Sequence, residues 1–298
     1  MGSTVFAVFL PLALAVVMFG LGLTLTIDDF ARVLRFPKAA VIALACQMVV
    51  LPAICLGLTY LFGLDGALAV GMMLLAASPG GPSANLFSHV AGGNVALNIT
   101  LTAINSVLAV FTMPLVVALS TALFLDDTGS LGLRPDKFAQ VFAIVLVPVA
   151  IGMWVHRRFA SWAQSRRGTV KILSVVVLAL VVAAAVGKNV DTLTENIGTL
   201  AAICLLFAIV SLTIGYFAPL VFRVRADQAI ASAMEIGVHN GAIAIAIAVA
   251  ASVLRDDTMA VPGAVYGVLM NIPAAIAAFL LARRARQDQP AAEPSVVR

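Results

Sequence analysis

Several apolar runs in this sequence are long enough to cross a lipid bilayer, and this feature limits the possible folds more than any other. A transmembrane helix needs about 20 consecutive apolar residues, and the run over residues 226–254 exceeds that length. Only 11% of the 298 residues are charged and 62% are hydrophobic, whereas a soluble domain carries about 25% charged residues. We therefore expect an all-α integral membrane protein.

Nine transmembrane helices are predicted when the apolar runs are taken in order. They cover approximately residues 5–25, 39–62, 66–90, 94–125, 138–156, 170–186, 197–222, 226–254 and 259–282. No linker separates soluble domains, so residues 1–286 are expected to form one transmembrane unit. Residues 287–298 are polar and are expected to form a disordered cytoplasmic tail.

The basic residues predict the orientation of the chain. With nine spans, fourteen of the 18 Lys and Arg residues fall on one side of the membrane. Cytoplasmic loops carry an excess of positive charge, so we expect a multi-pass protein of the cell membrane with its N-terminus outside and its C-terminus in the cytoplasm. The net charge of +4 does not indicate nucleic-acid binding, because the basic residues lie in short loops between apolar runs.

Two of the apolar runs are interrupted in their middle by glycines beside polar residues. The third run contains residues 79–82, Pro-Gly-Gly-Pro, and the eighth contains Glu235, Gly237, His239 and Gly241. Glu235 is the only acid that falls well inside an apolar run, and an ionisable group at membrane depth is by default a functional candidate. Paired interruptions in two halves of a chain indicate the binding site of a secondary transporter, built on inverted repeats. We expect two broken helices that cross near the midplane and offer positive half-helix N-termini to an anion.

Polar residues in the neighbouring runs could supply ligands for a cation. Asn98, Thr102 and Asn105 follow one another at helical spacing and form a stripe on the fourth span. A hard cation is bound by several oxygen atoms, which Glu235, Asn85, Asn98 and Thr102 could supply. Asn105 taken alone is more typical of a contact between helices, and His239 is either a structural partner or a functional group. The three cysteines lie inside apolar runs, as small buried residues do.

The chain resembles the bile acid:sodium symporter family along nearly its whole length. The residues that carry the resemblance are 18–25 (MFGLGLTL) with Asp29-Phe30, 47–52 (QMVVLP), 79–81 (PGG), 93–97 (GNVAL), 235–237 (EIG) with Asn240, and 261–264 (VPGA) with Asn271. The resemblance implies a bacterial-type member that lacks the first of ten helices. It also implies a core domain of about residues 39–125 and 197–282, packed on a panel domain of about residues 5–25 and 138–186.

The resemblance further implies two sodium sites. The first would use Asn85, Asn98, Thr102 and Glu235, with Ala84 where the family commonly has serine and Ser83 as a possible compensation. The second would share Glu235 and add the ligands Gln47, the backbone carbonyls of Ile236 and Val238, and His239, which stands where the family has glutamine. An imidazole is a poorer sodium ligand than an amide oxygen, and it could carry a proton instead.

The expected function is secondary active transport, with sodium-coupled symport of a small organic anion by alternating access as the first hypothesis. Ser83, Asn240 and Asn271 are expected to face the substrate, and the lipid bilayer and sodium are the other expected partners. One alternative is a proton-coupled or sodium-independent organic anion transporter that uses His239 and Glu235. A remote alternative is an intramembrane hydrolase that uses Ser83 and a histidine. The substrate and the oligomeric state stay open at this point.

Overall fold

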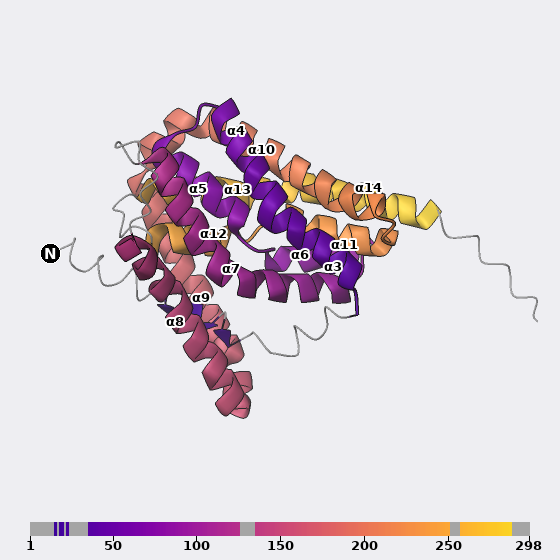
Figure 1. Cartoon of the computed structure of the whole chain (residues 1–298), viewed down its shortest axis with the longest axis horizontal. Helices are drawn as coiled ribbons and strands as arrows, with labels where there is room; N and C mark the ends of the chain where they lie inside the picture. Colours follow the sequence, from indigo (N-terminus) through magenta and orange to yellow (C-terminus); the bar gives the residue numbers. More distant parts are fainter. Residues whose placement is uncertain are drawn as a thin grey trace, which may run out of the picture.

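A computed structural model describes residues 15–16, 18–20, 22–23, 35–125, 135–250 and 257–287. Every regular element among these residues is a helix (Figure 1). Four helices of the described part are long and apolar enough to cross a membrane: Pro37–Leu61, Val95–Phe124, Val190–Val221 and Thr258–Arg284. The chain is therefore an all-helical, multi-pass membrane protein, and the count of nine spans stays a prediction. Most of the first expected span, and residues 288–298 of the expected tail, lie outside the described residues.

The second expected span is one membrane-length helix with a widened turn in its middle. It comprises α3 (Pro37–Ala45), the π-helical segment η1 (Cys46–Val50) and α4 (Leu51–Leu61). Pro52 has no N–H to donate to the Met48 carbonyl, and its ring would crowd that carbonyl in an α-helix. The Leu51 N–H instead bonds to the Cys46 carbonyl, five residues back, which leaves Gln47 buried within the π segment.

The third and eighth expected spans are both broken where their glycines lie. The third consists of α5 (Gly66–Ala77) and α6 (Pro82–Val90), and the eighth of α11 (Ala226–Gly237) and α12 (Gly241–Ala250). In the third span, two prolines at residues 79 and 82 each remove a backbone donor, so the helix ends before the first and restarts at the second.

The two breaks pair with each other by backbone hydrogen bonds. Gly80 and His239 form an isolated antiparallel bridge. On either side of it, the Gly81 N–H donates to the Val238 carbonyl at 2.7 Å and the Asn240 N–H donates to the Pro79 carbonyl at 2.7 Å. The C-terminal ends of α5 and α11 and the N-terminal ends of α6 and α12 therefore meet in one place.

Longer helices surround this crossing. They are α7 (Val95–Phe124), α8 (Pro135–Arg158), α9 (Ala160–Lys188) and α10 (Val190–Val221). The side chain of Asn94 caps α7 by accepting the Leu97 N–H at 3.0 Å. Helix α9 begins at Ala160, earlier than residue 170 where hydropathy placed the sixth span, because Gln164, Arg166 and Arg167 are good helix formers. Figure 1 shows α8 and α9 extending together away from the other helices at the lower edge of the view.

The ninth expected span contains η3 (Asp257–Ala260), α13 (Val261–Leu269) and α14 (Asn271–Gln287). The helix is interrupted at Met270, where the ring of Pro273 excludes a regular hydrogen bond to Leu269.

The broken eighth span packs closely on α10. A Cβ added to Gly237 would lie 2.5 Å from the Leu212 side chain, and one added to Gly215 would lie 2.6 Å from the side chain of Ile236. The cysteines Cys46, Cys55 and Cys204 are all free and buried in this interior.

Candidate functional site

Glu235 lies in the last turn of α11, is fully buried, and is surrounded by donors from α7. The Thr102 hydroxyl donates to Oε2 at 2.5 Å, and the Asn105 amide donates to Oε1 at 3.0 Å. The Asn98 amide is 3.4 Å from Oε2. The stripe on α7 therefore faces the acid, since residues spaced by three and four positions share one side of a helix.

Gly80 brings the break between α5 and α6 against the same carboxylate. Its backbone is hydrogen bonded to Glu235. A Cβ added to Gly80 would lie 2.4–2.5 Å from the carboxylate carbon and both of its oxygens, so only glycine fits there. The hydrogen-bond partners of Glu235 among the described residues are all uncharged.

The amides of α7 around Glu235 each leave a buried carbonyl oxygen without a partner. The Asn98 nitrogen donates to the Ala231 carbonyl at 3.0 Å as well as to Glu235, and the Asn105 nitrogen donates to Glu235. Because these neighbours are all acceptors, the nitrogen and oxygen of each amide cannot be exchanged. The Oδ1 atoms of Asn98 and Asn105 consequently stay unpaired inside the protein.

Gln47 shows the same pattern on the other side of the crossing. Its nitrogen donates to the carbonyls of Ala76 and Ser78 at 3.2 and 2.9 Å, at the C-terminal end of α5. Its Oε1 is buried and has no hydrogen-bond partner. The orientation of this amide is also fixed by two acceptors, so the oxygen is available only to a donor or a cation.

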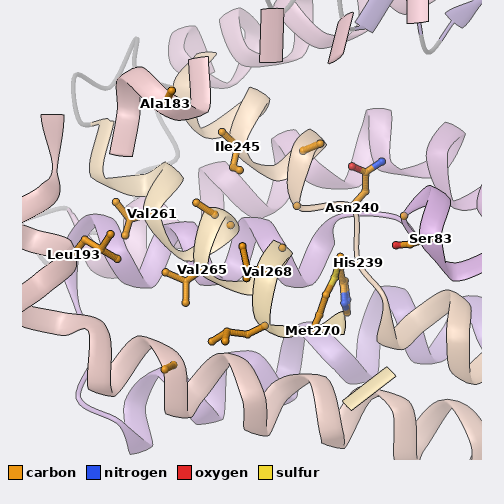
Figure 2. A pocket seen from close by; sticks show the side chains of 18 of the residues that line it. Ser83, Ala183, Leu193, His239, Asn240, Ile245, Val261, Val265, Val268 and Met270 are labelled. Carbon is orange, nitrogen blue, oxygen red and sulfur yellow. The ribbon is translucent and has the colours of Figure 1, made fainter. Parts of the chain in front are cut away.

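The His239 side chain lies in an aromatic cluster. Its Nδ1 is 3.0 Å from the Tyr266 hydroxyl, which donates to the Gly237 carbonyl at 3.0 Å. That hydroxyl donates its single proton to the carbonyl, so it can only accept a hydrogen bond from the imidazole. Nδ1 must therefore carry the proton of the imidazole. The ring packs on Phe207 with 5.3 Å between ring centroids. Figure 2 shows the side chains of His239 and Asn240 pointing in opposite directions.

The remaining expected ligands form no side-chain hydrogen bond with Glu235 among the described residues. Asn85 is half-buried on α6, and its Oδ1 is buried without a partner; no hydrogen bond joins it to Glu235 among the described residues. The Val238 carbonyl is taken by the Gly81 N–H. Ile236 is buried on α11 beside Gly215, and Ala84 is buried on α6.

A cavity of about 970 Å³ lies beside the crossing, at the N-terminal ends of α6 and α12. Ser83 and Asn240 are at one end of it and Leu193 is at the other (Figure 2). Its lining contains no Lys, Arg, Asp or Glu among the described residues, and its long wall is apolar, formed by residues such as Ile245 and Val265. The cavity therefore offers a large apolar surface with polar groups at one end.

The two asparagines expected to face the substrate differ in position. Asn240 lines the cavity, and its Oδ1 accepts the Ile243 N–H at 3.1 Å, which caps α12. Asn271 is absent from the described lining, and its amide donates to the carbonyls of Gly267 and Val268 in the preceding turn of its own helix.

One residue of this site, Asn105, contacts Glu235 more closely than the sequence pattern alone indicates. Taken alone, Asn105 is typical of a contact between helices, yet it donates to Glu235 at a shorter distance than Asn98 does. The sequence signal for this contact is the spacing, because Asn105 is seven residues after Asn98 and so falls on the same face of α7.

Comparisons with known proteins point in one direction. A sequence model described as the Sodium Bile acid symporter family matches residues 11–196. The "Uncharacterized sodium-dependent transporter YocS" of Bacillus subtilis (strain 168) is 26% identical over 288 residues, which are 96% of this chain and 87% of that protein. The "Probable sodium/metabolite cotransporter BASS1, chloroplastic" of Arabidopsis thaliana is 27% identical over 91% of this chain and 66% of its own length. The "Ileal sodium/bile acid cotransporter" of Homo sapiens is 28% identical over 62% of this chain and 52% of its own length.

Proposed function

Because the chain belongs to the sodium bile acid symporter family, we propose that it moves a small organic anion across the cell membrane together with sodium, by alternating access. The family assignment makes the chain a transporter and not an enzyme. The intramembrane hydrolase with Ser83 as nucleophile is therefore set aside.

The observation that carries this proposal is the buried carboxylate of Glu235, surrounded by neutral donors and by amide oxygens that lack a partner. A buried ionised carboxylate is unfavourable by several kcal/mol unless a charge compensates it. A buried amide oxygen without a donor is also unfavourable, by about 1–3 kcal/mol. A sodium ion beside Glu235 would remove both penalties, since a hard cation takes oxygen ligands.

Each expected ligand has a role in the first sodium site under this proposal. Glu235 balances the charge, and Asn85, Asn98 and Thr102 supply oxygen atoms. The unpartnered Oδ1 atoms of Asn85 and Asn98 support that role. Thr102 donates its proton to Glu235, so its oxygen lone pairs remain for the cation.

The second sodium site of the proposal uses Gln47, Glu235 and the carbonyls of Ile236 and Val238. The unpartnered oxygen of Gln47 supports it. His239 supports it less, because its Nδ1 bonds to Tyr266, its ring packs on Phe207, and its unpartnered Nε2 is a poorer sodium ligand than an amide oxygen.

The substrate of the proposal enters the large cavity beside the crossing. Its anionic group would lie near Ser83, Asn240 and the N-termini of α6 and α12, where the helix dipoles favour negative charge. Sodium at Glu235 and the anion in the cavity would then occupy opposite helix ends of the same crossing. This arrangement couples them, because both ligands stabilise the paired breaks.

The proton-coupled alternative has less support than sodium coupling. It requires His239 and Glu235 to exchange a proton. No hydrogen bond joins these side chains in the described residues, and the two side chains have separate partners on different helices.

The test compares sodium with potassium on purified protein in detergent. A ligand that binds only the folded state raises the melting temperature, so sodium should raise Tm and potassium at equal ionic strength should not. Glu235→Gln should remove this sodium response, whereas Glu195→Gln, which changes an exposed acid of α10, should keep it. Proteoliposomes with an inward sodium gradient can then be screened with organic acids. A full sodium response in Glu235→Gln would refute the role given to the carboxylate.

A further inference from the structure

A second, much smaller cavity lies between η1, the break after α5, and α7. Its volume is about 10 Å³, and its polar lining residues are Gln47, Asn105 and Thr112. A space of this size holds about one water-sized particle. The cavity is separate from the large one, since the two share no lining residue.

The polar atoms available to this cavity are acceptors. Gln47 and Asn105 both line it, and each has a buried amide oxygen with no partner while its nitrogen is engaged elsewhere. The rest of the lining is apolar and includes Pro52 and Pro79, which have no N–H to donate. Only the Thr112 hydroxyl could act as a donor, and it is equally able to act as an acceptor. An occupant must therefore be a cation or a molecule that donates hydrogen bonds.

The neighbouring carboxylate favours a cation over water. The Asn105 amide donates to Glu235 at 3.0 Å, and a hydrogen bond to a carboxylate polarises the amide so that its oxygen becomes a stronger acceptor. The cavity thus lies one residue away from a buried negative charge. A cation there would interact favourably with this charge, whereas a water molecule would leave it uncompensated.

We propose that this cavity binds one sodium ion through the amide oxygens of Gln47 and Asn105 and the hydroxyl of Thr112. This inference rests on the sodium-coupled function proposed above. Asn105 takes the place of His239 as a ligand, because the His239 Nδ1 is engaged by Tyr266, the ring packs on Phe207, and the unpartnered Nε2 is a poorer sodium ligand than an amide oxygen. Relative to the second site of the proposed function, this site keeps Gln47 and replaces the carbonyls of the α11–α12 break with Asn105 and Thr112.

Thr112→Val gives the sharpest test, since it removes one oxygen from the small cavity and keeps the shape of the side chain. The matched control is Thr121→Val on the same helix, whose hydroxyl donates to the carbonyls of Val117 and Ala118. Binding of radioactive sodium to the purified full-length protein should fall by one ion in Thr112→Val, or require about tenfold more sodium for that ion. Thr121→Val should bind sodium as the wild type does.

Asn105→Leu provides an independent variant, with Asn196→Leu as its control because the Asn196 amide donates to the Thr192 carbonyl of its own helix. Asn105→Leu should lose at least the same ion. If it fails to fold, Thr112→Val still decides the question.

The experiment distinguishes failure of the small-cavity site from failure of the proposed function. A wild-type protein that binds sodium while Thr112→Val behaves like Thr121→Val would overturn the inference and identify the cavity as a water site. A wild-type protein that binds no sodium would instead overturn the proposed function itself.

Discussion

At the scale of single residues, the site is built from one acid and the polar stripe of α7. Thr102 and Asn105 donate to different oxygens of Glu235, so the carboxylate is held in a defined orientation. Neither donor carries a charge, so under the proposed function a sodium ion compensates the buried carboxylate.

His239 and Tyr266 supply a prediction at this scale. Tyr266→Phe should lower the free energy of unfolding by about 1–3 kcal/mol, because the Gly237 carbonyl and the His239 Nδ1 would both lose a buried partner. Tyr60→Phe, which changes an exposed tyrosine, should have little effect on thermal unfolding.

A second prediction at this scale concerns ion coupling. His239→Gln should keep the sodium response of Tm, and uptake by the wild-type protein should not respond to an imposed pH gradient. Loss of the sodium response in His239→Gln would mean that the imidazole ligates the ion.

Glu235 could be predicted from the sequence because a lone acid deep in an apolar run has few explanations other than function. Helical spacing predicted that Asn98, Thr102 and Asn105 share one face of a helix, and the structure turns that face toward Glu235. The position of the His239 ring could not be predicted, since adjacent residues in a break point to opposite sides and no periodic rule applies there. The partners Phe207 and Tyr266 come from α10 and α13, so only the tertiary packing brings them to the histidine.

At the scale of elements, the paired breaks depend on glycines with different surroundings. An added Cβ at Gly80 meets the Glu235 carboxylate at 2.4–2.5 Å, while one at Gly81 meets the His239 carbonyl at 3.1 Å. Backbone and carboxylate are thus in direct contact at Gly80 only, and the second glycine has slightly more room.

Gly80→Ala should therefore be more harmful than Gly81→Ala. We expect Gly80→Ala to cost about 1–3 kcal/mol of stability through overpacking and to abolish the sodium response of Tm, since the carboxylate must move. Gly57→Ala in α4, where an added Cβ meets nothing within 4 Å, should be stabilising by about 0.5–1 kcal/mol. Equal effects of Gly80→Ala and Gly81→Ala would show that the glycines serve helix packing alone.

The sequence predicted the two broken helices because glycine and proline act locally. It did not predict the π segment of the second span, in which the Leu51 N–H reaches the Cys46 carbonyl, since a proline in a membrane helix can equally produce a kink. The early start of α9 at Ala160 was missed for a related reason. Hydropathy detects the part of a helix that crosses the bilayer, and polar turns that continue it are invisible to that measure.

At the scale of the whole molecule, the distribution of basic residues predicts the orientation in the membrane, which the arrangement of the helices alone does not reveal. The basic excess on one side predicts a cytoplasmic C-terminus. A fluorescent protein fused after Arg298 should therefore fold and fluoresce, because it stays in the cytoplasm, and a periplasmic phosphatase fused there should be inactive. An active phosphatase and a dark fluorescent fusion would place the C-terminus outside, which means either the opposite orientation of nine spans or a different number of spans.

The burial of Cys46, Cys55 and Cys204 has a practical consequence for observing this transporter at work. All three cysteines of the chain are shielded within its interior, so a water-soluble thiol reagent has little to label in the native sequence. A single cysteine introduced at Ser83, which lines the large cavity, would then carry nearly all of the label. Its rate of labelling from each side of the membrane, with and without sodium, would test whether the cavity opens to the two sides in turn, without the three native residues having to be replaced first.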